Sequence, residues 1–445
     1  MLLRKSGSSA LSWCTAVVLG VSASAAPVFA SGNLDPGFGT GGEVLINFGS
    51  GSASLSYAYA VMPDGHGNVY VAGTNAADGN NYYYAIAKLG PTGALVPGFG
   101  TGGKATIIHG AGLDYISAMT QDSSGNLYLA APTTTGTRHD FAVLKLDATG
   151  HPVAGFGSNG VATIVVGPTD NFAQAIALDG SGHVYLAGYS KGQFWSFEAT
   201  KMDAATGSPV ASFGNNGAVH LDIGPPRQDG FANALQLDSV GNLYLAGFTS
   251  GTTGNDFRAM KLNANGSFVD WGVDTFDIGS NSNDRVYAAA LDSSNHLHMV
   301  GYTDANGGDF AAIELDTSGN LVPGYGSGGK AVYNLSTNTT HPSYSMALDG
   351  AGNAYVGVAG YSVSGNGVFA AAELDVNGNL VPNFGSGGKQ TVSFGAGKAA
   401  FSNAIALDGS GHLYLAGGSG STTNPQFAVA RLLTDTIFRN GFEAH

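Results

Sequence analysis

Charge and sulfur are both scarce in this sequence. Charged residues make up only 11% of the 445 positions, well below the ~25% of an average soluble domain. The single cysteine, Cys14, lies in an N-terminal segment of distinct composition, so residues 31–445 contain no thiol for a disulfide or a thiolate-bound metal. Only three tryptophans are present, too few for a docking girdle repeated around a quinone cofactor. The 31 acidic residues outnumber the 17 basic residues, and the formal net charge is −14. This negative charge disfavours nucleic acid and anionic lipid as partners.

Long hydrophobic runs are lacking except near the start of the chain. Arg4 and Lys5 precede an apolar stretch over residues 11–26, and small residues follow before Ser31. This order is typical of a secretory signal that is cleaved on export, and it predicts a signal over residues 1–30. Serine and glycine interrupt the stretch, and no later segment approaches the ~20 apolar residues of a membrane span. We therefore expect no membrane span in the exported protein.

The sequence does contain one unit repeated seven times. Each unit has an alternating Ala-rich run, a turn that begins with Asp, a Tyr-centred apolar run, and a Phe-led run that ends near a charged residue. The turn aspartates recur about every 57 residues, near the range of propeller blades. They are Asp64, Asp122, Asp179, Asp238, Asp292, Asp349 and Asp408. Because the alternation has period two and the turns supply Asp and Gly, we expect each unit to form antiparallel strands.

Four short strands per unit, without helical periodicity of useful length, predict an all-β fold: a seven-bladed β-propeller with four antiparallel strands per blade. One such sheet cannot bury both faces alone, so it must stack on its neighbours, with the Ala-rich strands nearest to the crowded axis. The exported chain begins with a fourth-type strand over residues 43–48 and ends with a third-type strand over residues 427–432. This predicts that the N-terminal strand completes the last blade and closes a ring over residues 31–433, which also hides exposed sheet edges.

A Pro-Gly-Phe-Gly motif or a variant of it recurs at residues 34–42, 96–100, 322–326 and 381–385. In this motif and in the order of its parts, the chain resembles the bacterial delta-60 repeat family over nearly all of residues 33–433. The resemblance implies an exported β-propeller and supplies no catalytic residues. Residues 434–445 resemble a short C-terminal tail of many exported gammaproteobacterial proteins, which implies a sorting or surface-display tag. The signal and these resemblances imply a periplasmic, cell-surface or extracellular location in a Gram-negative bacterium.

Two motifs that match cofactor or catalytic signatures fit the repeat better. The glycines of residues 37–42 match the dinucleotide pattern G-x-G-x-x-G, but they precede a strand, whereas phosphate binding needs them at the start of a helix. Residues 188–192 match the hydrolase pattern G-x-S-x-G around Ser190, which requires a strand-to-helix turn. We interpret the first as a tight crossover between strands and the second as the start of a loop, and we predict no catalytic residues.

The sequence also predicts no metal site and no cofactor. His183, His296 and His412 occupy one equivalent turn position on different blades, so they cannot share an ion, and we interpret them as solvent-exposed turn side chains. Residues 375–379 resemble a calcium loop but lack the spacing and the terminal Glu of an EF-hand. Calcium held through loop carbonyls remains an alternative.

Loops that join second to third strands and fourth to first strands should emerge on one face, here called the loop face. These segments vary most among the seven units, and variation on a constant frame is how a scaffold carries recognition. Aromatic side chains there can stack on a sugar or anchor a protein, and acidic ones suit a cation, a basic partner or a polyhydroxylated ligand. The predicted binding residues are Asp78, Tyr82, Tyr83, Asp114, Asp170, Phe194, Trp195, Asp229, Asp284 and Asp304.

These observations favour an exported, non-enzymatic binding or surface-interaction module, expected to be a monomer, that takes a protein or carbohydrate ligand on its loop face. The main alternative is an enzyme, a glycan-directed hydrolase or lyase with carboxylates from several blades at the propeller axis. Carboxyl groups about 5 to 9 Å apart at the channel mouth would favour that enzyme. A purely structural protein of the cell envelope is a third alternative.

Overall fold

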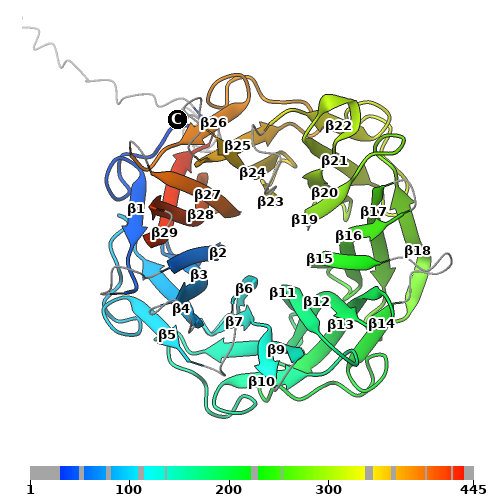
Figure 1. Ribbon diagram of the computed structural model, residues 1–445, viewed down its shortest axis with the longest axis horizontal. Helices are drawn as coiled ribbons and strands as arrows, with labels where there is room; N and C mark the ends of the chain where they lie inside the picture. The colour runs from blue at the N-terminus through cyan, green and yellow to red at the C-terminus, as the bar shows by residue number, and fades with distance from the viewer. Residues whose placement is uncertain are drawn as a thin grey trace, which may run out of the picture.

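The computed structural model describes residues 31–49, 55–76, 82–108, 115–135, 138–221, 229–251, 254–335, 344–361, 367–395, 398–421 and 424–434. These residues form seven antiparallel sheets arranged around a central axis, as Figure 1 shows. The predicted seven-bladed all-β propeller is therefore confirmed. The predicted signal and residues 435–445 of the tail lie outside the described residues.

Blades are numbered in chain order. Blade 1 contains β2 (Leu55–Pro63), β3 (Val69–Ala76), β4 (Tyr82–Leu89) and β5 (Lys104–Ile107). Blade 2 contains β6 (Ala118–Gln121), β7 (Leu127–Ala130), β9 (Arg138–Leu146) and β10 (Val161–Ile164), and the short β8 (Thr133–Thr135) pairs with β9. Blade 3 contains β11 (Asn171–Leu178), β12 (His183–Lys191), β13 (Trp195–Asp203) and β14 (Ala218–Leu221). The first strand of each blade lies innermost (Figure 1).

The remaining blades repeat this order. Blade 4 contains β15 (Gly230–Leu237), β16 (Leu243–Ser250), β17 (Asn255–Leu262) and β18 (Phe268–Phe276). Blade 5 contains β19 (Arg285–Leu291), β20 (Leu297–Tyr302), β21 (Phe310–Leu315) and β22 (Lys330–Tyr333), and a 3-10 turn, η1 (Ala305–Gly307), precedes β21. Blade 6 contains β23 (Tyr344–Leu348), β24 (Ala354–Tyr361), β25 (Gly367–Leu374) and β26 (Lys389–Val392). Blade 7 contains β27 (Ala399–Leu407), β28 (His412–Ser421), β29 (Asn424–Leu433) and, from the other end of the chain, β1 (Glu43–Ile46).

Blade 7 joins the two ends of the chain. β1 pairs antiparallel with β29, so that Glu43 lies opposite Ala430 and Ile46 lies opposite Phe427. Arg431 reinforces this junction, because one of its guanidinium nitrogens lies 2.6 Å from Asp35. The last blade is thus completed by the first strand.

The burial of the strands follows their position in the ring. Exposure alternates along first strands such as β2, whereas second strands such as β3 and β7 are buried along their whole length because neighbouring blades cover both faces. Each of the seven interfaces between neighbouring blades carries its own core cluster among the described residues; Ile86 of blade 1 and Leu129 of blade 2 share one of them. The hydrophobic core is therefore a ring of interfaces between sheets. In the described part of the chain, no helix has the length and hydropathy to span a bilayer.

The glycine-rich crossover links blades to each other. Gly100 adopts a φ of 53°, where a side chain would be strained. Its amide donates a hydrogen bond of 2.7 Å to the carbonyl oxygen of Thr149 in the next blade. An added Cβ would lie 2.1 Å from the carbonyl oxygen of Lys104. The G-x-G-x-x-G pattern therefore serves blade packing at this place.

Candidate functional site

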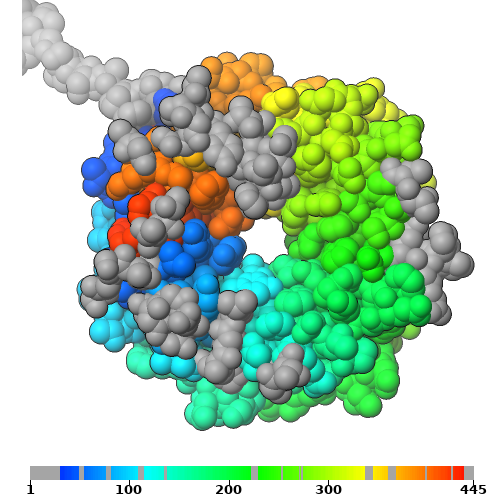
Figure 2. All heavy atoms as spheres, in the orientation of Figure 1, coloured from blue at the N-terminus to red at the C-terminus, as the bar shows by residue number. Residues whose placement is uncertain are grey.

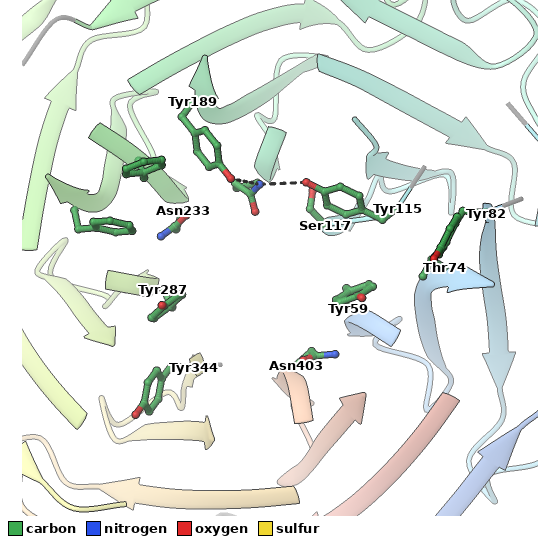
Figure 3. A pocket seen from close by; sticks show the side chains of 13 residues that line it. Tyr59, Thr74, Tyr82, Tyr115, Ser117, Tyr189, Asn233, Tyr287, Tyr344 and Asn403 are labelled. Atoms are coloured by element: carbon green, nitrogen blue, oxygen red, sulfur yellow. Dashed lines mark hydrogen bonds between the residues drawn. The ribbon is translucent and has the colours of Figure 1, made fainter. Parts of the chain in front are cut away.

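A ring of seven side chains, one from each blade, surrounds the propeller axis. We call it the axial ring, and each member lies five positions before the turn aspartate of its blade. The members are Tyr59, Ser117, Gln174, Asn233, Tyr287, Tyr344 and Asn403. All seven line one cavity of about 750 Å³. The central opening is visible in Figure 2, and Figure 3 shows side chains of the ring around the space in the middle.

A β-bulge places most of these side chains in the channel. In five blades the register between the first and second strands shifts at the ring residue, so that one residue has no partner across the ladder. In blade 3, for example, Ala173 pairs with Gly188 and Ala175 pairs with Ala187, which leaves Gln174 as the extra residue. Such an extra residue bends the strand and re-aims its side chain.

A glycine in the second strand makes room for the bulge. A Cβ on Gly188 would lie 2.0 Å from the carbonyl oxygen of Phe172, a distance that no side chain can occupy. The equivalent glycines of the other four bulged blades meet the same kind of carbonyl oxygen at 1.8 to 2.0 Å; they are Gly73, Gly247, Gly301 and Gly417. Blades 2 and 6, for which the described residues show no register shift, have Ala131 and Val358 at this position. The bulge and the glycine therefore occur together.

The cavity opens on the loop face. Besides the axial ring, its lining comes from the ends of second strands, the starts of a first and a third strand, and the segment just before β6. These residues are Thr74, Tyr82, Tyr115, Tyr189, Phe231 and Phe248. These strand ends adjoin the loops that vary among the repeats. None of the thirteen described lining residues is Asp, Glu, Lys, Arg or His. The cavity is therefore lined by aromatic rings, amides and hydroxyls without formal charge.

An aromatic arc forms the wall of the cavity along blades 3 and 4. The rings of Tyr189 and Phe231 lie 5.1 Å apart in an edge-to-face arrangement, and Phe231 stacks on Phe248 at 4.9 Å. Trp195 lies behind this wall, 5.4 Å from Tyr189 and 5.8 Å from Phe231. The guanidinium of Arg285 covers Phe248 at 5.6 Å. These contacts fix the orientation of the exposed rings, because aromatic pairs favour edge-to-face and offset geometries.

Amide side chains of the axial ring are held by the neighbouring blades. Nδ2 of Asn233 donates a hydrogen bond of 2.7 Å to the carbonyl oxygen of Val286, and Asn403 donates one of 2.9 Å to Ala58. Nε2 of Gln174 lies 3.5 Å from the hydroxyls of both Tyr115 and Tyr189, as the dashed lines in Figure 3 mark. These contacts pre-orient polar groups around the cavity.

Four of the cavity tyrosines keep their protons at neutral pH. Burial raises the pKa of Tyr59 to about 12. Burial also raises the pKa values of Tyr115, Tyr189 and Tyr344 above the ordinary tyrosine value. These hydroxyls therefore both donate and accept hydrogen bonds, and none is poised as a phenolate base.

Two of the ten predicted binding residues belong to this site. Tyr82 lines the cavity, and Trp195 supports the aromatic arc from behind. Tyr83 and Phe194 are half-buried on the loop face and are not among the described lining residues. Asp78 and Asp114 lie outside the described residues.

Three of the predicted aspartates clamp one blade to the preceding one. The carboxylate of Asp170 accepts a hydrogen bond from the amide of His139, and Asp229 accepts one from the amide of Trp195. Asp284 is fully buried; its own amide donates to the carbonyl oxygen of Asn255, while its carboxylate accepts from neighbouring hydroxyls and an amide. These carboxylates are engaged by the backbone and hydroxyl groups around them.

Asp304 remains exposed and forms a second kind of clamp. Its two oxygens accept hydrogen bonds from the backbone amide and the side-chain amide of Asn283, at 2.7 and 2.8 Å.

An acidic cluster lies nearby, where carboxylate oxygens of Asp256, Asp277 and Asp284 all lie within 4.8 Å of one another. Burial, followed by the charges of Asp277 and Asp284, raises the pKa of Asp256. This group is the acidic cluster that the described residues of the loop face present.

The axial ring was not predicted, although the sequence carries a signal for it. Its position lies five residues before the turn aspartate in every unit. In five blades a glycine also stands three residues after the Tyr or His of the second strand. Within one repeat these residues are ordinary strand positions. Their convergence depends on the bulge and on closure of the ring.

Ser190 is not arranged as a nucleophile. It is fully buried, and its hydroxyl donates a hydrogen bond of 2.5 Å to Oε1 of Glu198. Nδ1 of His220 lies 2.6 Å from the same oxygen. Because the carboxylate stands between the serine and the histidine, the histidine is not in place to accept the serine proton.

Comparison with known proteins finds only remote structural similarity. No protein-family model matches the chain, and no curated protein matches it in sequence. Similar solved structures include a protein of unknown function from Dyadobacter fermentans, at 10% identity and a TM-score of 0.47, with 90% of this chain and 100% of that chain covered. A PL25 ulvan lyase bound to -[GlcA(1-4)Rha3S]- has 11% identity and a TM-score of 0.46, with coverage of 84% and 91%. The β-propeller domain of the Trilobed protease from Pyrococcus furiosus has 11% identity and a TM-score of 0.43, with coverage of 84% and 96%.

Proposed function

We propose that this protein is an exported, non-catalytic binding module whose axial cavity takes an uncharged, polyhydroxylated ligand of the carbohydrate class. The observation that carries the proposal is the lining of the cavity, which consists of aromatic, amide and hydroxyl side chains without a charged residue among those described. Aromatic rings stack on the apolar faces of sugars, and amides and hydroxyls pair with sugar hydroxyl groups.

The form of the cavity also suits a small ligand. Its volume of about 750 Å³ falls within the ~300–1,000 Å³ of typical ligand sites. The walls are held before any ligand arrives, because the aromatic arc is packed from behind by Trp195 and the amides of Asn233 and Asn403 are anchored to adjacent blades. Such pre-organisation lowers the entropic cost of binding.

The enzymatic alternative finds less support in this lining. Hydrolysis of a glycosidic bond ordinarily requires two carboxyl groups beside the scissile bond. The described cavity residues provide none. The carboxylates of Asp170 and Asp229 hold neighbouring blades together, and that of Asp284 accepts a hydrogen bond from Thr303. A carbohydrate-binding scaffold therefore accounts for more of the site than a carboxylate-based hydrolase or lyase does.

A glycan array followed by calorimetry tests the proposal. We expect the full chain to bind a defined class of neutral glycans, and we expect Tyr287→Ser to weaken that binding at least about tenfold, equivalent to ~1.4 kcal/mol. Serine is the axial-ring residue of blade 2, so the substitution stays within the variation of the repeat. Tyr83→Ser on the same face is the control and should bind normally.

Each result bears on a different part of the proposal. Loss of binding in Tyr83→Ser but not in Tyr287→Ser would move the site away from the axis. New reducing or unsaturated ends on the glycan after incubation would show that the protein cleaves it, and the proposed binding module would then be an enzyme. Repeating the array with a calcium chelator tests whether the acidic cluster of Asp256, Asp277 and Asp284 contributes.

A further inference from the structure

The turn face, opposite the loop face, carries a repeated polar quartet. In blade 1 it consists of Asp64, Asn68, Tyr70 and Lys88. Nδ2 of Asn68 donates a hydrogen bond of 2.7 Å to Oδ2 of Asp64. Nζ of Lys88 lies 3.4 Å from the same oxygen and donates a hydrogen bond of 2.8 Å to the hydroxyl of Tyr70. The lysine therefore neutralises the turn aspartate.

Blade 5 departs from this quartet at every position except the aspartate. His296 replaces the Asn of four blades, and His298 replaces the Tyr found in the six other blades. Glu314 stands where four blades have Lys and one has Arg. Tyr325 stands where five blades have the Phe of the crossover motif. The changes bring two imidazoles and an additional carboxylate to Asp292 and remove the neutralising cation.

Three of these side chains converge at one point, and the ring of His298 faces the aspartate among them. The ligand atoms of Asp292, His296 and Glu314 all lie within 4.8 Å of one another. Nδ1 of His296 lies 2.7 Å from Oε1 of Glu314 and 3.9 Å from Oδ2 of Asp292. Nε2 of His298 lies 3.8 Å from the same Asp292 oxygen. In a tetrahedral zinc site, with ligands ~2.0–2.2 Å from the ion, neighbouring ligand atoms are roughly 3.3 to 3.6 Å apart.

His298 provides an independent reason to expect a ligand. The residue is only 3% exposed, and neither of its ring nitrogens has a hydrogen-bond partner in the described structure. A buried polar group without a partner is costly. The buried ring of Tyr325 packs edge-on against it with centroids 5.9 Å apart. A metal ion next to Asp292 would satisfy the nitrogen that already faces that carboxylate.

We propose that Asp292, His296, His298 and Glu314 bind a divalent transition-metal ion of the zinc type, in a structural site on the turn face of blade 5. Two imidazoles and two carboxylates are ligands that zinc accepts in tetrahedral geometry, whereas calcium prefers six to eight oxygens. The ion supplies the positive charge that lysine supplies in four other blades. His296 is 30% exposed at its side chain and Asp292 18%, which leaves a route from solvent to the site.

Metal titration of the full chain tests the site. After chelator treatment, we expect calorimetry with Zn²⁺ alone to show one tight equivalent per chain and Co²⁺ to give the absorption bands of a tetrahedral complex. His298→Tyr and Glu314→Lys restore the residues of other blades, so folding should survive, and each should weaken Zn²⁺ binding at least about 100-fold. His183→Asn is the matched control, because His183 contacts Asp179 in the same turn position but lies in a blade that keeps its Tyr and Lys.

Thermal unfolding supplies the second measurement. Zn²⁺ should raise the melting temperature of the wild type and of His183→Asn, but not that of His298→Tyr, and excess Ca²⁺ should not reproduce the effect. The proposal is overturned if the wild type binds less than one equivalent, or if His298→Tyr, folded by circular dichroism, retains the wild-type affinity. If His183→Asn lost as much Zn²⁺ affinity as His298→Tyr, the proposal would also be overturned, because binding would then depend on turn histidines in general.

Discussion

Six of the seven turn aspartates hold a hairpin through both carboxylate oxygens, whereas among the described residues Asp292 in blade 5 accepts hydrogen bonds through Oδ1 alone. In blade 2, Oδ1 of Asp122 accepts hydrogen bonds of 2.9 Å from the amides of Ser124 and Asn126, and Oδ2 accepts one of 2.8 Å from the Asn126 side chain. Burial acts to raise the pKa of Asp122, but these hydrogen bonds outweigh it and the pKa is lowered. The pKa is lowered in the same way for Asp64, Asp179 and Asp408.

This arrangement predicts a loss of stability in acid. The folded state lowers the pKa values of these aspartates, so the ionised carboxylates stabilise the fold. This stabilisation is fully present above the pKa of an unfolded aspartate, about 3.9, and is lost as the pH falls through the lower pKa values of the folded state. Asp122→Ala should reduce the free energy of unfolding by about 1–2 kcal/mol at pH 7, and by less at a pH below the folded values. Urea unfolding at both pH values measures this difference. An equal effect in both conditions would contradict the ionic contribution.

At the scale of the element, a first strand and the glycine opposite its bulge form one functional unit. The bulge aims Gln174 at the axis in blade 3, and Gly188 accommodates the carbonyl oxygen of Phe172 that the bulge displaces. A β-bulge of this kind links strand geometry directly to the composition of the cavity.

Alanine at Gly188 should therefore damage blade 3. The added methyl group cannot fit 2.0 Å from the Phe172 carbonyl oxygen, so the strands must separate, and we expect a loss of about 1–3 kcal/mol in the free energy of unfolding. Gly180 offers the control, because a Cβ there would meet no heavy atom within 4 Å. Gly180→Ala should remain within about 0.5 kcal/mol of wild type. Comparable denaturant midpoints for the two variants would argue against the steric role of Gly188.

At the scale of the whole molecule, the junction in blade 7 holds the ring closed. Phe38 is fully buried and packs edge-on against Tyr414 at 5.8 Å, while Arg431 lies over its face at 4.6 Å. Arg431 also donates a hydrogen bond of 2.7 Å to the carbonyl oxygen of Pro91 in blade 1. Residues near both chain ends and the first blade are therefore joined through one side chain.

Deleting residues 31–50 should destabilise the entire ring. The deletion removes β1, exposes the edge of β29 and uncovers the core shared by blades 7 and 1. We expect a clearly lower melting temperature and increased aggregation, because an unpaired edge strand templates association. Leu45→Ala, at a residue of β1 that is 38% exposed, is a control that should melt close to the wild type. Unchanged melting of the deletion would show that the ring does not depend on this closure.

Much of the architecture could be predicted because it is encoded locally and repeatedly. Turn chemistry at residues such as Asp122 and period-two alternation in the first strands are properties of neighbouring residues, so seven copies predicted seven blades of four strands. The same reasoning predicted Tyr82 and several loop-face aspartates as binding residues, and of these the structure places Tyr82 in the lining of the cavity. The carboxylate of Asp229 accepts a hydrogen bond from the amide of Trp195 in another blade, a partner that no local pattern identifies. The family resemblance, export and monomeric state remain predictions.

The sequence by itself determined the repeat, the strand order and the all-β class, because those depend on contacts within one unit of about 57 residues. Only the tertiary structure decided the site. The axial ring collects one side chain from each of seven units, and the quartet of blade 5 places His296 and Glu314 together across two strands. Such convergence follows from ring closure, strand register and the bulges, which depend on packing between sheets and not on the local pattern.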